Sequence, residues 1–329
     1  MLRLTQYAQG GGCACKIPAA DLEAMLAGFG HTPPKNPLGE LLVGTETGDD
    51  AAVVSLQGDT AIVSTADFFT PVVDDPYDWG RIAAANALSD VYAMGGRPLV
   101  GLNLLVWPRE GLPYEVAARV LEGGAEVAAL AGCHLAGGHS VNGEEPMYGV
   151  AVTGVADPAK LMRNDAGRAG LPLSLTKPIG SGVLNNRHKA TGESFPQAVE
   201  VMTALNADAS AAALAAGVRC ATDVTGFGLL GHLYKLARAS GVTAVVDAAA
   251  VPLIEGARAS VQAGYVPGGS RRNLDWVAPF LDAEGVPEDL LILLADAQTS
   301  GGLLVAGEIP GATVIGELRP PTDHTVIVR

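Results

Sequence analysis

The sequence predicts an α/β protein of the α+β type with two domains, and three observations lead to this prediction. The chain has 329 residues, of which 48% are hydrophobic and 17% charged, which is enough to build a large core. Short apolar runs alternate with helical patterns in both halves. A polar stretch with glycines at 157–170 separates the halves and marks the best boundary between domains.

The first half opens with a glycine-rich segment, a short helix expected at 21–29 and a proline-rich connection. We therefore expect an N-terminal segment of residues 1–40 and an N-terminal domain of residues 41–156. In that domain the apolar patterns predict, in order, strands at 49–56 and 60–69, a helix at 79–96, a strand at 99–107, a helix at 114–132 and a strand at 148–156.

The second half repeats the alternation and is expected to form a C-terminal α/β domain of residues 157–329. Its predicted elements are a strand at 172–179, an Ala-rich helix around 197–216, a strand at 218–224, a helix at 227–240, a strand at 242–248, a helix near 253–264 and a strand at 303–306.

The charge and the apolar runs exclude several classes of protein. A net charge of −14 argues against nonspecific binding to nucleic acid or to an anionic membrane, because both require a positive surface. The longest apolar runs fall well short of the roughly 18 residues that a membrane span requires. Four cysteines show no disulfide pattern of secreted proteins, so we expect a cytoplasmic protein with reduced thiols.

Aspartates stand at or near the ends of apolar runs in five places, which is the strongest chemical signal in the chain. Any one of them alone could equally be a capping or turn residue. Several together suit hard divalent cations such as Mg2+, which bind carboxylates and nucleotide phosphates. The aspartates are Asp49 with Asp50, Asp67, Asp90, Asp223 and Asp296.

Glycine turns accompany these aspartates, and unsubstituted backbone can approach a phosphate closely. They lie at 93–96, 135–140, 175–182, 225–231 and 298–302. The sequence contains no GxxxxGK[ST], which excludes a P-loop ATPase.

The stretch GFGLLG at 226–231, with Asp247 at the end of the next predicted strand, also fits a dinucleotide fingerprint. Against this alternative, Asp223 precedes the turn and would repel a pyrophosphate unless a metal intervened.

The segment TQYAQGGGCACK at 5–16 places two thiols beside a cation. A CxC pair without a later partner motif argues against structural zinc. A lysine nearby favours the thiolate of Cys13, and the glycines suggest a mobile arm, whereas Cys15 reads equally well as incidental.

Taken together, these motifs closely resemble selenophosphate synthetase (selenide, water dikinase), a family of the aminoimidazole ribonucleotide synthetase-like superfamily. The resemblance covers essentially the whole chain in order, and the cysteine-lysine segment separates this family from other ATP users of the superfamily. The motifs are TQYAQGGGCACK, TGDDAAVV, STADFF, GRIAAANALSDVYAMGG, LAGGHS, LTKPIGSGVL, ATDVTGFGLLGHL and DAQTSGGLL.

The resemblance implies a homodimer formed through the N-terminal domains, with ATP and Mg2+ near the interface, and synthesis of selenophosphate, AMP and orthophosphate from ATP, selenide and water. Gln9 stands where many members have histidine, so a proton-transfer role there is in doubt. The resemblance further implies catalytic roles for Cys13 and Lys16, metal ligation by Asp50, Asp90 and Asp223, and nucleotide binding by Lys16, Thr47, Gly48, Asp49, Asp67, Asp90, Gly138, His139 and Ser140.

Two rival functions stay open from the sequence. Another ATP-dependent small-molecule kinase or ligase of the superfamily would release ADP and would not need Cys13. A selenium or metal carrier would use the thiols without turning over ATP. The source of selenide, free or from a delivery protein, is equally open.

Overall fold

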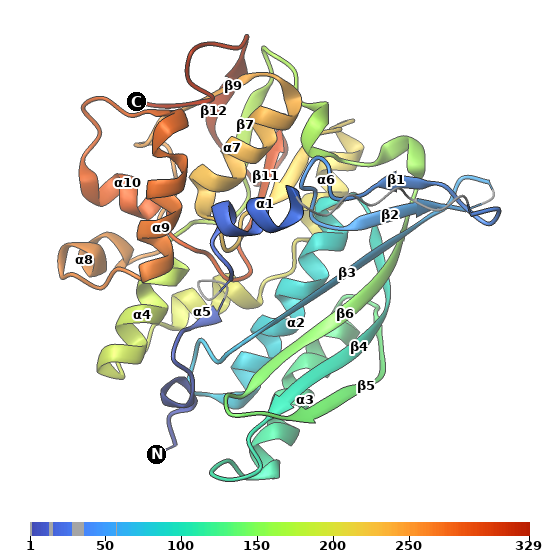
Figure 1. The fold of residues 1–329 in the computed structure, drawn as a ribbon, viewed down its shortest axis with the longest axis vertical. Helices are drawn as coiled ribbons and strands as arrows, with labels where there is room; N and C mark the ends of the chain where they lie inside the picture. Colours follow the sequence, from blue (N-terminus) through green and yellow to red (C-terminus); the bar gives the residue numbers. More distant parts are fainter. Residues whose placement is uncertain (1, 13–15, 28–35, 57) are drawn as a thin grey trace.

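The computed structural model describes residues 2–12, 16–27, 36–56 and 58–329 and consists of two sheets with their helices. Figure 1 shows the sheet of the first half below and that of the second half above, with the N- and C-termini at opposite ends of the long axis. Both halves mix strands and helices, so the predicted α/β class is confirmed.

The first sheet has six strands in the order β1-β2-β3-β6-β4-β5. Neighbouring strands are antiparallel except β4 and β5, which are parallel. Strand β5 lies at one edge of the sheet, and β6 and β4 separate it from β3. The bounds are β1 Leu41–Val43, β2 Ala52–Ser55, β3 Ala61–Phe69, β4 Arg97–Trp107, β5 His134–Asn142 and β6 Met147–Ala156.

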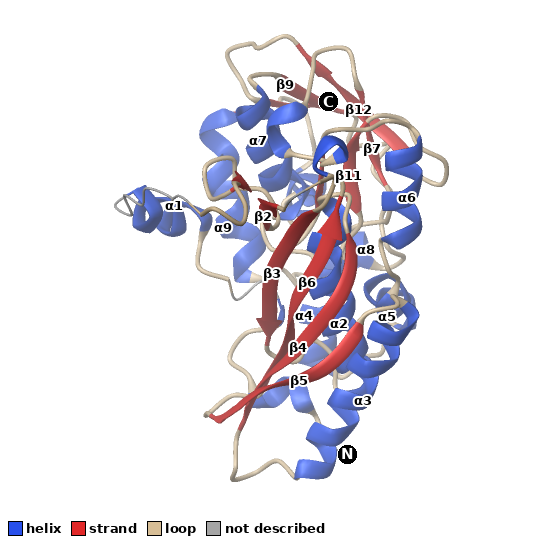
Figure 2. Ribbon diagram, turned by 90° about the vertical axis from the view of Figure 1, so that its right-hand side faces the viewer, coloured by secondary structure: helices blue, strands red, loops and turns tan. Residues whose placement is uncertain are grey.

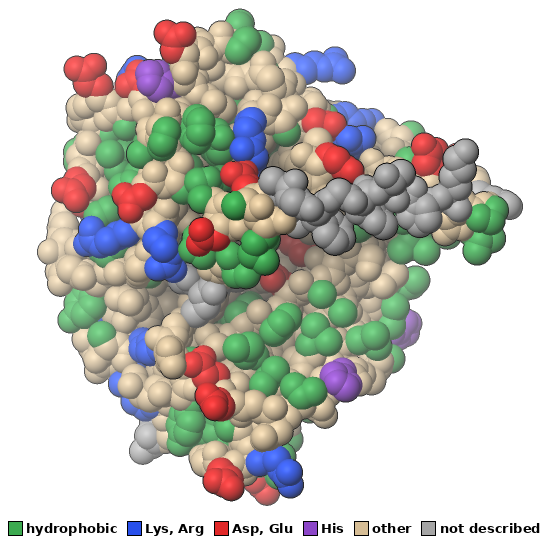
Figure 3. Space-filling view, viewed as in Figure 1, with side chains coloured by type: hydrophobic (Ala, Val, Ile, Leu, Met, Phe, Trp, Pro, Cys, Tyr) green, Lys and Arg blue, Asp and Glu red, His purple; other side chains and the backbone are tan. Residues whose placement is uncertain are grey.

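Two long helices, α2 (Pro76–Ala93) and α3 (Tyr114–Leu130), cover one face of this sheet (Figure 2). Helix α2 begins after Asp75, which is its N-cap residue. The Asp75 carboxylate accepts the N–H of Asp78. Among the described residues no long helix lies on the opposite face, and apolar side chains gather there in Figure 3. They include Phe68, Leu99, Leu102 and Val141, each about half exposed.

The second sheet has seven strands in the order β10-β13-β9-β12-β7-β11-β8. The bounds are β7 Pro172–Leu175, β8 Ala221–Asp223, β9 Thr243–Val246, β10 Leu281–Asp282, β11 Leu303–Ala306, β12 Thr313–Arg319 and β13 Val326–Val328. The remaining helices are α1 Ala19–Ala27, α4 Ser181–Thr191, α5 Pro196–Thr203, α6 Ala207–Ala215, α7 Gly228–Ser240, α8 Ala257–Gln262, α9 Gly268–Val277 and α10 Glu288–Leu294.

Helix α2 also packs against the second half, through α5, α6 and β8. The Asn206 side chain donates 2.8 Å to the hydroxyl of Ser89 on α2, and the Ser210 hydroxyl donates 2.7 Å to the carbonyl of Tyr92. Buried side chains of both halves, such as Leu88 and Met202, belong to one hydrophobic cluster. The two halves therefore share a core along α2.

The structure departs from the sequence prediction in several elements. A single helix was expected at 197–216, but the structure has two helices, α5 and α6, with a turn at Asn206 between them. The Asn206 side chain donates hydrogen bonds to the Ser89 hydroxyl and to the carbonyl of Gly301 at this turn. The strands that were not predicted are β1, β5, β10, β12 and β13, and the helices that were not predicted are α4, α9 and α10. The GFGLLG turn does not join neighbouring strands, since β12, β7 and β11 separate β8 from β9.

Glycines set the distance between α2 and α3. A β-carbon on Gly80 would collide with the carbonyl oxygen of Val120, and one on Gly123 would collide with that of Tyr77. We expect Gly80→Ala to lower the free energy of unfolding by about 1–3 kcal/mol, because the helices would have to separate. Urea denaturation of the full chain measures this.

The matched control is Ala118→Ser, an exposed position on α3, which should change stability by less than about 0.5 kcal/mol. Equal effects of Gly80→Ala and Ala118→Ser would contradict close packing of the two helices.

Candidate active site

Four carboxylates from separate segments converge where the two sheets meet. Asp50 lies just before β2, Asp67 lies on β3, Asp90 lies in the last turn of α2 and Asp223 ends β8. Burial raises the pKa of Asp90 well above its usual range, and Asp223 and Asp67 raise it further. Asp50 adds to the same effect. The carboxylates thus lie close enough to oppose one another's ionisation.

Two of these carboxylates keep an oxygen without a hydrogen-bond partner among the described residues. Thr222 donates its hydroxyl to Oδ1 of Asp50 over 2.9 Å, while Oδ2 of Asp50 is buried and has no partner in the described part of the chain. The same holds for Oδ2 of Asp223 among the residues that the structure describes. Burial raises the pKa of Asp223 to about 6, although a hydrogen bond from Ser89 lowers it. Unpaired buried carboxylate oxygens are costly unless a cation binds them.

Asp67 is the partner of the lysine from the N-terminal segment. Nζ of Lys16 lies 3.1 Å from Oδ1 and 3.3 Å from Oδ2 of Asp67, and the lysine side chain remains 39% exposed. Asn86 on α2 donates 2.6 Å to Oδ2 of Asp67. Asn86 and Asp90 are four residues apart on one face of α2, so the helix supplies both groups to the cluster.

Thr47, Gly48 and Asp49 form a loop that is tied to the second half. The N–H of Asn164 donates 2.7 Å to Oδ1 of Asp49, and the Thr47 hydroxyl donates to Oδ2. The side chain of Asn164 donates 2.9 Å to the carbonyl of Gly48. Both carboxylate oxygens of Asp49 are therefore hydrogen-bonded, and Asp49 holds the loop in place. The buried oxygen that keeps no partner among the described residues is Oδ2 of the neighbouring Asp50.

Lys235 is a site residue that the sequence reasoning missed. Burial lowers the pKa of Lys235, and the nearby Asp50 opposes this shift. Its ammonium lies 5.2 Å from the ring centre of Phe227 and packs beside Gly48. The sequence signal that could have revealed Lys235 was its spacing on α7, because Lys235 follows the buried His232 by about one helical turn.

His232 is buried, as expected of a packing residue, and it shapes the turn after β8. Its Nε2 accepts the N–H of Thr225 over 3.1 Å, and Nδ1 lies 3.4 Å from the Thr222 hydroxyl. Burial, reinforced by Lys235, lowers the pKa of His232 well below its usual range, so the ring is neutral. His232 holds the turn that presents Asp223.

The second half supplies a buried cation behind the cluster. Lys177 donates to the carbonyls of Ala204 and Ser300, at 2.6 and 3.0 Å. Burial lowers its pKa to about 7, and Asp223 opposes this shift.

Asp296 serves a different purpose from the other aspartates. Its carboxylate accepts the N–H groups of Gly182 and Val183 at 3.0 and 3.2 Å, the Ser270 hydroxyl at 2.8 Å and the Gln298 amide at 2.9 Å. It is buried and fully hydrogen-bonded at the start of α4, and burial raises its pKa to about 7. We therefore interpret Asp296 as a capping residue.

Gly138, His139 and Ser140 lie on the edge strand β5 and are exposed. With two strands between β5 and β3, they are about 14 Å from Asp67 across the sheet. One chain therefore does not bring these three residues to the carboxylates.

A cavity of about 500 Å³ opens beside the cluster, lined by the Gly48–Asp50 loop, Thr65, Lys235 and Arg238. Among the residues that the structure describes, no three Asp, Glu, His or Cys side chains lie close enough to hold one ion by themselves. The unpaired oxygens of Asp50 and Asp223 nevertheless fit a hard cation, with phosphate oxygens of a nucleotide completing its shell.

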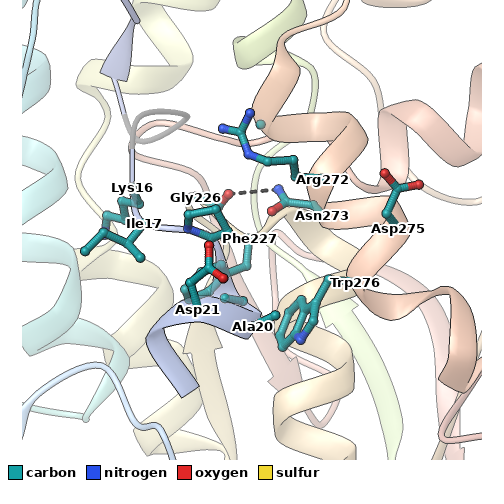
Figure 4. Close-up of a pocket in the computed structure, with 13 residues that line it drawn as sticks. Lys16, Ile17, Ala20, Asp21, Gly226, Phe227, Arg272, Asn273, Asp275 and Trp276 are labelled. Carbon is teal, nitrogen blue, oxygen red and sulfur yellow. Dashed lines mark hydrogen bonds between the residues drawn. The ribbon is translucent and has the colours of Figure 1, made fainter. Parts of the chain in front are cut away.

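A smaller cavity lies around Lys16 and is shown in Figure 4. It has a volume of about 350 Å³, and the Asn273 side chain donates 2.9 Å to the carbonyl of Gly226 in its wall. Arg272 and Trp276 on α9 also line it.

Known proteins with a similar sequence show the family of this chain. The chain is 49% identical over 317 residues to the selenide, water dikinase of Bordetella bronchiseptica, which covers 94% of this chain and 90% of that protein. It is 43% identical over 346 residues to the enzyme of that name from Caldanaerobacter subterraneus, covering 100% and 99%. The chain belongs to the selenide, water dikinase family. Residues 48–156 and 168–329 match the N- and C-terminal domains of AIR synthase related proteins.

Solved structures of other proteins show the same fold at low sequence identity. The thiamine monophosphate kinase of Aquifex aeolicus superposes with a TM-score of 0.62 at 17% identity, covering 85% of this chain and 90% of that one. A hydrogenase maturation protein HypE in complex with ATP gives 0.60 at 20% identity, covering 97% and 90%. The expected aminoimidazole ribonucleotide synthetase-like fold is confirmed.

Of the predicted site residues, Lys16, Asp50, Asp67, Asp90 and Asp223 come together, with the Thr47–Asp49 loop beside them. Cys13 and Cys15 lie outside the described residues. Within the described part of the chain, no helix is long and apolar enough to cross a membrane.

The crowded carboxylates predict a stability that depends on pH. A carboxyl whose folded pKa of about 6 exceeds its unfolded value binds its proton more tightly in the folded state, so its contribution is lost as pH rises from about 4 to 6. Without divalent cations at pH 7.5, Asp223→Asn should therefore raise the free energy of unfolding by about 1–3 kcal/mol. Near pH 4 the gain should vanish.

Thermal denaturation in EDTA across this pH range measures the effect, with exposed Asp59→Asn as the matched control. A loss of stability in Asp223→Asn at pH 7.5 would show that the carboxylate is net stabilising and would contradict the interpretation.

Proposed function

We propose that this chain synthesises selenophosphate from ATP, selenide and water, and releases AMP and orthophosphate. The relatives named selenide, water dikinase support this activity over nearly the whole chain. The structural observation that carries the proposal is the Lys16–Asp67 pair, which places a cation of the N-terminal segment at the edge of four converging carboxylates.

Asp50, Asp90 and Asp223 would hold Mg2+ in this enzyme. Bound there, Mg2+ neutralises phosphate oxygens and lets an acidic site accept a triphosphate. The unpaired oxygens of Asp50 and Asp223 support this assignment.

Lys16 and the Thr47–Asp49 loop position the nucleotide in our proposal. Phosphoryl transfer requires mainly orientation and charge neutralisation. The Lys16 ammonium can exchange its Asp67 partner for an oxygen of the transferring phosphoryl group, because its side chain is partly exposed at the cavity wall. Asn86 keeps Asp67 oriented through that exchange.

The first transfer forms a P–Se bond and breaks the bond between the γ-phosphorus and the bridging oxygen, leaving ADP. The second step adds water to the β-phosphorus of ADP and releases AMP and orthophosphate. We assign Cys13 as the residue that holds selenide, without a covalent bond to it, for the first transfer; Cys13 stands three residues before Lys16 in the same segment. A selenium-delivery protein and a cytoplasmic location fit this chemistry.

We further propose a homodimer in which the partner completes the nucleotide site. Gly138, His139 and Ser140 are exposed on β5 and lie away from the carboxylates of their own chain. The uncovered apolar face of the same sheet continues to that edge, with Phe68, Leu102 and other half-exposed side chains. Pairing two such faces would bury the apolar side chains and bring β5 of one copy to the carboxylates of the other.

The products of ATP turnover test the activity. With selenide, the wild type should form AMP, and Cys13→Ser should lose selenide-dependent AMP formation by about 100-fold or more. Cys15→Ser is the matched control and should stay within a few-fold of wild type. Separation of AMP from ADP by chromatography, with and without selenide, measures both.

Release of ADP as the end product would indicate a small-molecule kinase instead. Absence of any ATP turnover would indicate a carrier protein, and full activity of Cys13→Ser would remove Cys13 from the mechanism.

The dimer has its own test. Phe68→Glu places a charge on the uncovered sheet face and should shift the protein from dimer to monomer, with loss of ATP turnover. Leu130→Glu, at the exposed end of α3 and away from that face, should remain dimeric. Light scattering coupled to gel filtration measures the mass, and a Phe68→Glu dimer would rule out this face.

A further inference from the structure

The last turn of α4 holds the N-terminal segment before the segment reaches the active site. The guanidinium of Arg3 donates to the carbonyls of His188 and Lys189, at 2.7 and 3.1 Å. The Gln6 amide donates 2.9 Å to the same Lys189 carbonyl. The last four carbonyls of a helix lack partners within it, so the end of α4 offers acceptors that the segment satisfies.

The side chain of Lys189 holds the segment in a second way. Its Nζ donates to the carbonyls of Ala8, Gln9 and Gly10, the last two at 3.1 Å. An ammonium has three N–H donors, so these carbonyls use all of them. The chain bends at Gln9 and Gly10, and three oxygens that face one point repel one another unless a cation lies between them. Lys189 therefore stabilises this bend.

Asp74 holds the start of the segment independently of Lys189. Its carboxylate accepts the N–H of Thr5 at 2.9 Å and a guanidinium N–H of Arg3 at 2.7 Å. Loss of the Lys189 ammonium should therefore release the bend while the residues before it stay docked.

Beyond the bend, the segment passes between the two halves of the chain. A β-carbon on Gly12 would collide with the side chains of Val72 and Thr299, one from each half. Four residues later, Lys16 pairs with a carboxylate of the active site. The carbonyl of Gly10, held by the ammonium, is thus six positions in the sequence from the cation of the site.

We propose that Lys189 is a positioning residue for the reaction, because it fixes the bend and so sets where Cys13 and Lys16 meet the nucleotide. This inference rests on the proposed function. A short chain fixed at both ends samples fewer conformations than one fixed at a single end. A displacement of about 1 Å at the reacting groups can cost about 100-fold in rate. Because its three donors are bonded to backbone, Lys189 acts on the rate through the segment.

The first test replaces the ammonium with a neutral side chain. In Lys189→Met, kcat for selenide-dependent AMP formation should fall about 10–100-fold, because the bend loses its cation. The KM for ATP should change less than about threefold, since other groups of the proposed site bind the nucleotide. The Tm should move by no more than about 3 °C, because Asp74 still holds the start of the segment.

Lys160→Met is the matched control, and Lys189→Arg is the conservative variant. Lys160 lies in the connection between β6 and β7, pairs with Asp157 at 3.0 Å and is exposed. Its loss changes the net charge equally and should leave kcat within about twofold of wild type. Lys189→Arg should keep most of kcat, because a guanidinium also donates to several carbonyls.

A chemical rescue separates positioning from a general loss of packing. Lys189→Ala removes three carbons and the ammonium, which are the atoms of propylammonium. Lys189 lines an open cavity of about 450 Å³, so an amine in solution can reach the vacated place. We expect propylammonium to raise the kcat of Lys189→Ala several-fold and 1-propanol, which has no charge, to leave it unchanged.

An unchanged kcat in Lys189→Met would overturn the inference. A rise in the KM for ATP as large as the fall in kcat would also overturn it, and so would equal effects of propylammonium and 1-propanol on Lys189→Ala. In each case the wild type still forms AMP with selenide, and the proposed function stands. A wild type that forms no selenide-dependent AMP would refute the proposed function and the inference with it.

Discussion

The mutual repulsion of buried carboxylates is the constraint on which the rest of the site depends. Asp50, Asp90 and Asp223 each have a pKa above the usual range because they are buried together. Placing several like charges in one buried region costs free energy that only cations can offset. The protein surrounds the cluster with lysines that come from three separate segments, Lys16, Lys177 and Lys235, and their charges reach the cluster from different sides. These lysines reduce the repulsion, but two carboxylate oxygens keep no hydrogen-bond partner within the described ranges of the chain.

This arrangement requires the two halves of the chain to be fixed relative to each other. Asp223 comes from the second sheet, whereas the other carboxylates come from the first sheet and α2. The shared core along α2 and the bonds between the Thr47–Asp49 loop and Asn164 hold the halves in register. The backbone N–H of Ser300 donates 2.8 Å to the side chain of Asn86, so the same residue that orients Asp67 also joins the halves. Stability of the interface and geometry of the site are therefore parts of one network.

The sequence predicted what depends on local pattern. Long periodic segments such as α2 and α3 were recognised, and aspartates beside apolar runs pointed to Asp50, Asp67, Asp90 and Asp223. Strand β5 was missed because Gly137 and Gly138 look like a turn, yet Gly138 instead allows the backbone of Asn103 to pass within contact of it. Lys235 was missed because its role arises from packing of α7 against a loop almost 190 positions earlier. Asp296 looked like the other aspartates, and only its hydrogen bonds show that it caps α4. Contacts between distant segments, which no local pattern encodes, account for each of these misses.

The position of the N-terminal segment depends both on its own glycines and on contacts with residues that are distant in the sequence. A β-carbon on Gly12 would collide with the side chains of Val72 and Thr299, one from each half, so glycine is needed there for close approach as well as for its left-handed backbone. The glycines were expected to make the segment a mobile arm, and this stays a prediction. The structure shows the segment docked through Lys189 and Asp74. A segment held on both halves, with its lysine paired to a carboxylate of the site, responds to any change in the charge of that site. In the proposed mechanism Lys16 would exchange Asp67 for the phosphoryl group when a nucleotide binds, and this exchange would couple the position of the segment to occupancy of the site.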